Sequence, residues 1–312
     1  MTSKNILHTA TSRLQAATYS PRKLSALHAG ITTGVTLAFG LVTYLLSGSM
    51  DAAVGLSGLG TRTALRFIQT VLSFFLSAAI PFWELGYARA ALLYSQGQTP
   101  RPGDLLQGFR RFFPALGLMV IRLAAVFGVM YLCIQITFVL YMFSPFATPL
   151  MRALSELPML TPEYLDPLQH MLTPVYVLYA VLVVAALLLL FYRFRLADFA
   201  LMDGQKPFAA LGASFRCTKK RWKQLIRLDL HFWWYYLALG LCVTVSYLDV
   251  LLPFIGINED VAFWLCTVIG QLGNFAVLTL ANPLVQTSFA LFYSTHTSLP
   301  LSGEVSPQVT EG

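Results

Sequence analysis

Six long apolar runs are the feature that most limits what this chain can fold into. A helix that crosses about 30 Å of hydrocarbon needs roughly 20 apolar residues, and each run meets that requirement. The runs are continuous, whereas the strands of a membrane β-barrel alternate apolar and polar residues over about ten positions. We therefore predict an all-α polytopic membrane bundle with about six transmembrane helices. The predicted spans are Leu27–Leu46, Phe67–Tyr87, Leu116–Tyr141, Leu172–Tyr192, Phe232–Leu252 and Trp264–Leu284.

The low fraction of charged residues excludes a soluble globular protein. Of the 312 residues, 56% are hydrophobic and 11% are charged, whereas a typical soluble domain has about 25% charged residues. The mean hydropathy is +0.65. A chain of this composition has too little polar surface to cover its folded exterior, so lipid must cover much of it.

The positions of lysine and arginine predict the topology. Of the 21 basic residues, 17 lie in the N-terminal segment and in the connections that follow the second and fourth spans. Basic residues in short loops are retained on the cytoplasmic side of a membrane. We therefore expect both termini to be cytoplasmic. The expected organisation is a basic N-terminal tail over residues 1–26, a membrane domain over 27–294 and a flexible C-terminal tail over 295–312.

The two large cytoplasmic connections are similar in sequence. Gly97-Gln98-Thr99-Pro100 in the first corresponds to Gly204-Gln205-Lys206-Pro207 in the second, and Phe-Arg and Ile-Arg-Leu follow each at a similar distance. This pattern suggests a hairpin repeat over residues 67–141 and 172–252. Each unit would place a short amphipathic helix at the membrane interface after a glycine-proline turn. The alternative is that two cytoplasmic turns share glycine, proline and arginine through composition alone.

Five stretches of the chain resemble segments of a known protein family. They are Gln107-Gly108-Phe109, Ala210-Leu211-Gly212-Ala213-Ser214, Lys219-Lys220-Arg221-Trp222-Lys223, Leu228-Asp229-Leu230-His231-Phe232-Trp233-Trp234, and Pro283 followed by Phe289-Ala290-Leu291-Phe292-Tyr293. Together they resemble a bacterial membrane family known as domain of unknown function 975, over about residues 85 to 295. The resemblance implies a multi-span helical protein of a bacterial cytoplasmic membrane and brings no particular activity with it.

The last predicted span has the most polar side chains. At about 100° per residue its polar members fall on one face of the helix, which must therefore face protein or water. They could line a substrate path or form interhelical hydrogen bonds, and Gly270 and Gly273 would permit the close helix contact that such bonds need. The members of this polar stripe are Gln271, Asn274, Thr279, Asn282, Gln286 and Tyr293.

Glu84 and Arg122 lie near the cytoplasmic ends of the second and third spans. An unpaired charge at the membrane centre costs about 3 kcal/mol on insertion scales. We therefore expect the two residues to form an ion pair or to extend to the interface, in preference to a proton relay.

A basic and aromatic segment precedes the fifth span. Its cations could contact anionic lipid headgroups, and the aromatic run that follows is typical of a membrane-interface belt. The formal charge of +7 is spread over the membrane edges instead of forming a basic domain, so we do not expect nucleic acid as a partner. The candidate headgroup contacts are Lys219, Lys220, Arg221, Trp222, Lys223 and Arg227.

The sequence contains no recognisable catalytic, metal or cofactor motif. It has no phosphate-binding loop, no nucleophile elbow, and no histidine or cysteine pair at metal-ligand spacing. We therefore expect no cofactor, and we expect a non-enzymatic scaffold, regulator or lipid-interacting envelope component that acts through its basic hairpins. Such a component would bind membrane lipids and a membrane-protein partner or a second copy of itself. The alternative is a small-solute or lipid transporter that uses the polar stripe.

Overall fold

The computed structural model describes residues 2–52, 56–144, 147–148, 165–219, 221–250, 252 and 258–297. Within these ranges the regular structure is helical throughout, without a β-strand. The chain divides into two compact units, of which unit 1 comprises Met1–Ala115 with Leu196–Gly312 and unit 2 comprises Leu116–Arg195. The prediction of an all-helical chain is confirmed for the described residues.

Among the described residues, five helices are long and apolar enough to cross a membrane. Each contains one predicted span and extends beyond it, because the helix continues after the apolar run ends. The prediction of about six spanning helices is therefore confirmed to within one. The five helices are α2 (Pro21–Ala52), α3 (Leu56–Ser95), α5 (Phe112–Met142), α7 (Leu165–Phe194) and α12 (Glu259–Thr297).

The fifth predicted span, Phe232–Leu252, differs from the other five. Its place is taken by α11 (Trp233–Ser246), whose 14 residues extend over only about 21 Å. The preceding helix α10 (Trp222–His231) meets α11 at a bend of 60°, and only the two together are long and apolar enough to cross a membrane. The short 3-10 helix η4 (Leu248–Val250) follows α11. The predicted span is thus shorter and bent at its start.

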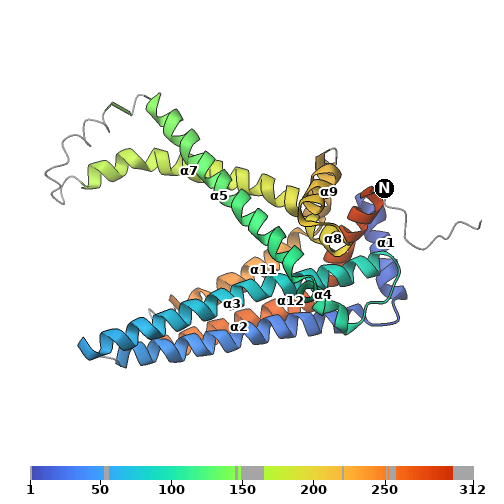
Figure 1. Ribbon diagram of the computed structural model, residues 1–312, viewed down its shortest axis with the longest axis horizontal. Coiled ribbons are helices and arrows are strands. Elements are labelled where there is room, and N and C mark those ends of the chain that lie inside the picture. The colour runs from blue at the N-terminus through green and yellow to red at the C-terminus, as the bar shows by residue number, and fades with distance from the viewer. Residues whose placement is uncertain are drawn as a thin grey trace, which may run out of the picture. The chain divides into compact units, whose positions relative to one another are not determined.

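Unit 1 is built on α2, α3, α11 and α12, which run side by side with α12 in contact with the other three (Figure 1). Two glycines of α12 allow α11 to approach closely. A Cβ on Gly270 would collide with the Ser246 hydroxyl, and a Cβ on Gly273 would lie 2.8 Å from the Cys242 sulfur. The expectation that these glycines permit close helix contact is confirmed.

Short helices cover one end of this bundle. The N-terminal segment, expected only as a basic tail, contains α1 (Ser3–Ala16), which packs against α12 through a buried face that includes Ile6 and Ala10. Helices α8 (Ala197–Met202) and α9 (Pro207–Lys219) pack on each other, and α8 packs on α3. The expected C-terminal tail is described only as far as Thr297.

The two glycine-proline turns of the proposed repeat share one backbone geometry. Gly97, after α3, has a φ of 76°, and Gly204, after α8, has a φ of 105°. The Gln98 amide donates to the Leu93 carbonyl at 2.9 Å, and the Gln205 amide donates to the Ala200 carbonyl at 3.2 Å. Both turns are Schellman motifs, in which a left-handed glycine closes the helix C-terminus.

Arginines cap the helix ends at both turns. The Arg13 guanidinium donates to the Ser95 carbonyl at the first turn. At the second turn, Arg111 donates to the Leu201 carbonyl at 2.7 Å and Arg89 to the Met202 carbonyl at 3.3 Å. A cation near the last carbonyls of a helix satisfies their free lone pairs and interacts well with the helix dipole.

The two connections differ after their turns. The first continues as a 3-10 helix η1 (Pro102–Leu106) and the single turn α4 (Gln107–Arg110). The second continues as α9, which has 13 residues. The expected short surface helix is therefore formed at full length only in the second connection. The repeat itself stays a prediction beyond the shared turns.

Unit 2 consists of most of α5 together with α7. The Arg122 guanidinium of α5 donates to the Phe194 carbonyl at the end of α7, at 2.9 Å. The Arg195 guanidinium lies 4.8 Å from the centre of the Phe191 ring. Exposed apolar side chains occupy both helices, as expected for helices that face lipid.

Candidate functional site

The bend between α10 and α11 presents cations on one side and apolar residues on the other. We call residues 221–234 the basic elbow. Leu225 and Leu228 of α10 are fully buried against unit 1, whereas Arg221, Lys223 and Arg227 are exposed. Residues three or four positions apart lie on the same face of a helix, so Leu225 and Leu228 share the buried face, and Lys223 and Arg227 share the exposed one.

Aromatic side chains surround the bend itself. Trp222 is 53% exposed and Trp233 is 61% exposed. Phe232, at the bend, is buried and its ring lies 6.3 Å from that of Phe289 in α12. The Tyr236 hydroxyl donates to the Asp229 carboxylate at 2.7 Å and so connects α11 to α10. These contacts hold the elbow in its bent conformation while its tryptophans remain on the surface.

The structure places five of the six predicted headgroup residues close together. Arg221, Trp222, Lys223 and Arg227 belong to the elbow, and Lys219 ends α9 two residues before it. Lys220 lies outside the described residues. Their contact with lipid stays a prediction.

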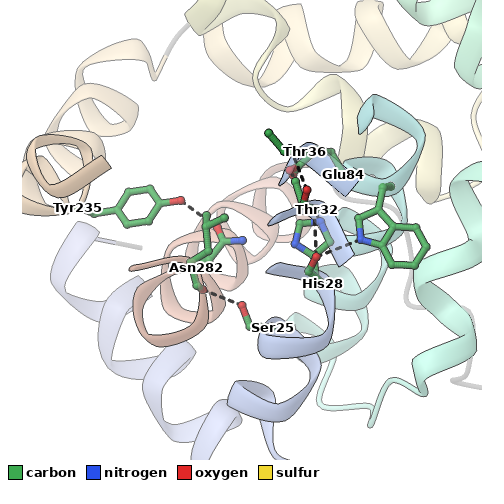
Figure 2. A network of polar contacts seen from close by, with 9 residues as sticks. Ser25, His28, Thr32, Thr36, Glu84, Tyr235 and Asn282 are labelled. Atoms are coloured by element: carbon green, nitrogen blue, oxygen red, sulfur yellow. Dashed lines mark hydrogen bonds and ion pairs between the residues drawn. The ribbon is translucent and has the colours of Figure 1, made fainter. Parts of the chain in front are cut away.

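The polar stripe of α12 contains two side chains with clear protein partners. The Tyr235 hydroxyl of α11 donates to the Asn282 side-chain oxygen at 3.2 Å, and Asn282 is only 2% exposed (Figure 2). Tyr293 receives a hydrogen bond from Gln205 and donates one to Asp203, both at 3.3 Å. Asn282 is thus hydrogen-bonded between helices, and Tyr293 is hydrogen-bonded to the turn that follows α8.

The other four stripe residues are half-buried along the same helix: Gln271, Asn274, Thr279 and Gln286. The Thr279 hydroxyl is among the buried polar atoms of the described residues that lack a hydrogen-bond partner. A substrate path along this face stays a prediction.

Asp203 lies at the second glycine turn, where helix α8 meets the C-terminal part of α12. Burial raises the pKa of its carboxyl above the ordinary value, while the hydrogen bond from Tyr293 and the charges of Arg89 and Arg111 act in the opposite direction. The turn is therefore fixed to α12 by a contact whose strength depends on the charge of Asp203.

Glu84 and Arg122, the predicted ion pair, belong to different units. Arg122 donates to the Phe194 carbonyl within unit 2. Within unit 1, a Glu84 carboxylate oxygen lies 3.8 Å from Nε2 of His28 in α2 (Figure 2). The pairing of Glu84 with Arg122 stays a prediction, and the neighbour that the structure defines for Glu84 is a histidine.

His28 is the site residue that the sequence pattern does not reveal. It is fully buried, and its backbone carbonyl accepts hydrogen bonds from the Trp83 indole at 3.3 Å and the Thr32 hydroxyl at 3.0 Å. Nearby, the Ser25 hydroxyl donates to the Leu278 carbonyl at 2.8 Å. These contacts connect α2 to α3 and α12. The sequence did contain one signal for it, because His28 is an ionisable residue within the predicted span Leu27–Leu46, and such residues often mark functional sites.

The described residues contain no group of three or more histidine, cysteine or carboxylate side chains that could hold a metal ion. Comparison with known proteins adds nothing to this geometry. No family model, curated protein or solved structure matches the chain. The resemblance to domain of unknown function 975 therefore stays a prediction, and function has to be inferred from the chain's own residues.

Proposed function

We propose that this chain is a non-enzymatic multi-pass protein of a bacterial cytoplasmic membrane that binds anionic lipid headgroups through its basic elbow. The observation that carries the proposal is the 60° bend between α10 and α11. It separates an amphipathic helix with exposed cations from an apolar helix with exposed tryptophans at its start.

The physical chemistry of a membrane interface accounts for each part of the elbow. An amphipathic helix with cations on its polar face lies in the interface, and tryptophans concentrate at the level of the headgroups. A lysine or arginine near an anionic surface contributes about 1 kcal/mol to binding. The bend would let α10 lie along the membrane while α11 enters the hydrocarbon.

The proposed orientation places the elbow and both termini on the cytoplasmic side. The distribution of basic residues supports this orientation. It is also supported by contacts at one end of unit 1, where α1 packs on α12 and its Arg13 caps α3. At the same end, the Cys217 sulfur of α9 lies 3.9 Å from the His296 carbonyl near the end of α12. A scaffold or regulator would then expose its lipid-binding elements on the cytoplasmic surface.

Lipid selectivity of the detergent-solubilised protein tests the proposal. The protein is offered fluorescent phosphatidylglycerol and phosphatidylcholine separately, and binding is measured by fluorescence anisotropy. We expect a preference for phosphatidylglycerol that decreases about tenfold or more when Arg221, Lys223 and Arg227 are replaced by glutamine, because three favourable contacts of about 1 kcal/mol are lost.

A matched variant controls for net charge. Replacing Lys4, Arg22 and Lys23 by glutamine removes the same charge from three exposed positions of the N-terminal segment. This control should keep the preference for phosphatidylglycerol. Equal binding of both lipids by the unmodified protein, or an equal loss in both triple variants, would reject the elbow as the binding site.

A further inference from the structure

We propose that His28 and Glu84 form a proton-binding site between α2 and α3. The site takes up one proton from water and holds it between Nε2 of His28 and a carboxylate oxygen of Glu84. This inference rests on the geometry of unit 1 and is independent of lipid binding by the elbow.

The imidazole of His28 is enclosed by protein yet lacks a hydrogen-bond partner in the part of the chain that the structure describes. Neither of its ring nitrogens has one among the described residues, and the side chain is fully buried. Buried polar nitrogens are nearly always hydrogen-bonded, so an unsatisfied pair in a protein interior indicates a missing partner. A Glu84 carboxylate oxygen lies 3.8 Å from Nε2 of His28 and can accept such a bond.

Glu84 can supply that partner through a small movement. A charge-assisted hydrogen bond between nitrogen and oxygen has a length of about 2.7–2.9 Å, so the present separation is about 1 Å too long. The Glu84 side chain is 48% exposed and can rotate toward the imidazole without disturbing a packed core. Figure 2 shows the two side chains approaching each other from neighbouring helices.

Two aromatic rings make the surroundings of His28 suitable for a cation. The Tyr87 ring lies 4.6 Å from the imidazole, and the Trp83 ring lies 6.2 Å away, nearly parallel to it. A cation within about 6 Å of an aromatic face is attracted by the ring quadrupole. Glu84 on one side and these rings on the others would therefore stabilise positive charge on the imidazole.

The proton balance is simple. Neutral His28 and ionised Glu84 together carry one negative charge. Uptake of one proton gives imidazolium with carboxylate, a pair without net charge, in which the proton lies on Nε2 and points to the carboxylate oxygen. Because the two groups are coupled, they bind this proton as a unit.

Few other ionisable groups among the described residues face the pair. One is Tyr87 of α3, whose ring lies beside the imidazole. Another is Asp198 of α8, whose charge acts on Glu84. Tyr235 of α11 is bonded to the uncharged Asn282 of α12. A second carboxylate near Glu84 favours uptake of a proton, because like charges in a low dielectric repel.

Trp83 provides a local probe of this proton. In a variant that keeps Trp83 and replaces Trp222, Trp233, Trp234 and Trp264 by phenylalanine, emission reports on the ring that stacks on His28. A protonated imidazole in contact with indole quenches its fluorescence. Titration from about pH 8 to about pH 4 brackets the ordinary range of histidine and glutamate. We expect one transition in which emission falls on acidification.

Three substitutions in the Trp83 variant decide the outcome. His28→Gln should abolish the transition, and Glu84→Gln should abolish it or move it to lower pH because the carboxylate no longer supports the proton. His8→Gln, which changes an exposed histidine of α1, should leave it unchanged. The absence of a transition before substitution, its persistence in His28→Gln, or an unchanged midpoint in Glu84→Gln would each overturn the proposal.

A second measurement keeps both His28 and Glu84 in place, so it can be used even if His28→Gln does not fold. The other four histidines, at positions 8, 170, 231 and 296, are replaced by glutamine, and the ring nitrogens of His28 are observed by ¹⁵N NMR. We expect both nitrogens to shift over the same pH range as the Trp83 emission. Ring nitrogens that do not respond to pH would contradict the proton-binding site.

Discussion

The backbone carbonyl of Phe82 in α3 occupies the position that a β-carbon on Gly108 of α4 would need. A second contact runs in the opposite direction, from α3 to the connection. A β-carbon on Gly86 of α3 would collide with the backbone carbonyl of Leu105 in η1. The connection that follows α3 therefore packs on α3 through two glycine contacts between backbones. Leu105 itself is fully buried in the core cluster that includes Leu24, Tyr87 and Tyr94.

Gly108→Ala should destabilise unit 1. A methyl group added at a position that backbone atoms already occupy forces the connection away from α3. Such overpacking typically lowers the free energy of unfolding by roughly 1–3 kcal/mol. The apparent melting temperature in detergent should fall accordingly. Gly103→Ala is the matched control, because a β-carbon at Gly103 would meet nothing within 4 Å. Equal melting temperatures for the two variants would contradict the close packing.

The two Schellman turns should respond alike to loss of their glycines. Gly97→Ala and Gly204→Ala each force an L residue into the left-handed region, which costs about 1–2 kcal/mol. Asparagine at either position should cost less, because it tolerates this conformation. Thermal unfolding of the four variants measures the effect. Gly128→Ala is the control, because a β-carbon at this position of α5 would meet nothing within 4 Å. It should leave the stability unchanged or raise it. If Gly128→Ala lowers the stability as much as the turn variants do, the left-handed conformation is not the cause of their loss.

Asp203 should make stability depend on pH. Because burial raises its folded-state pKa above the ordinary value of 3.8, its contribution to stability is fully present below that value and is lost as the pH rises through the raised pKa. Relative to Asp203→Asn, the unmodified protein should lose stability as the pH rises above the ordinary value of 3.8 and through the raised pKa. Melting temperatures in detergent across this range provide the measurement.

Tyr293→Phe tests the hydrogen bond that limits the rise in the pKa of Asp203. The Tyr293 hydroxyl stabilises the Asp203 carboxylate, so its removal should raise the pKa of Asp203 further and enlarge the loss of stability on ionisation. The same substitution in the Asp203→Asn background should add no pH dependence. The stability of the unmodified protein is compared with that of Asp203→Asn at each pH. If this difference in stability stays constant as the pH rises, or changes in favour of the unmodified protein, the arrangement is contradicted.

The Tyr235–Asn282 hydrogen bond should be a modest structural contact. Interhelical side-chain hydrogen bonds in membranes are worth about 0.6 kcal/mol on average. In a double-mutant cycle, Tyr235→Phe and Asn282→Leu should each destabilise the protein and show a favourable coupling energy of about that size. A coupling energy near zero, with Asn282→Leu leaving stability intact, would instead free Asn282 for the role in a substrate path that the transporter alternative gives it.

The spanning helices could be predicted because their signal is local. Twenty consecutive apolar residues identify a helix such as α5 without knowledge of its neighbours. The short, bent α11 could not be predicted in this way. At the bend before its start at Trp233, Phe232 is buried with its ring 6.3 Å from that of Phe289, which lies 57 positions later in the chain, and such a long-range contact leaves no local signal.

The candidate sites were predictable to different degrees. Glycine followed by proline predicted both turns, because glycine tolerates positive φ and proline suits the first turn of a helix. The exposed cations of α10 followed from helical spacing. His28 was not predicted, because its burial and its approach to Glu84 depend on how α2 packs against α3, and a single histidine in a sequence carries no record of that contact.

Quenching of Trp222 by brominated lipids tests the proposed lipid-binding elbow most directly. Trp83, Trp233, Trp234 and Trp264 are replaced by phenylalanine, and the protein is reconstituted in vesicles that contain the same fraction of either brominated phosphatidylglycerol or brominated phosphatidylcholine. If the exposed cations beside Trp222 bind anionic headgroups, brominated phosphatidylglycerol should quench more strongly, and replacing Arg221, Lys223 and Arg227 by glutamine should remove the difference. Equal quenching by the two lipids before that replacement would contradict the account.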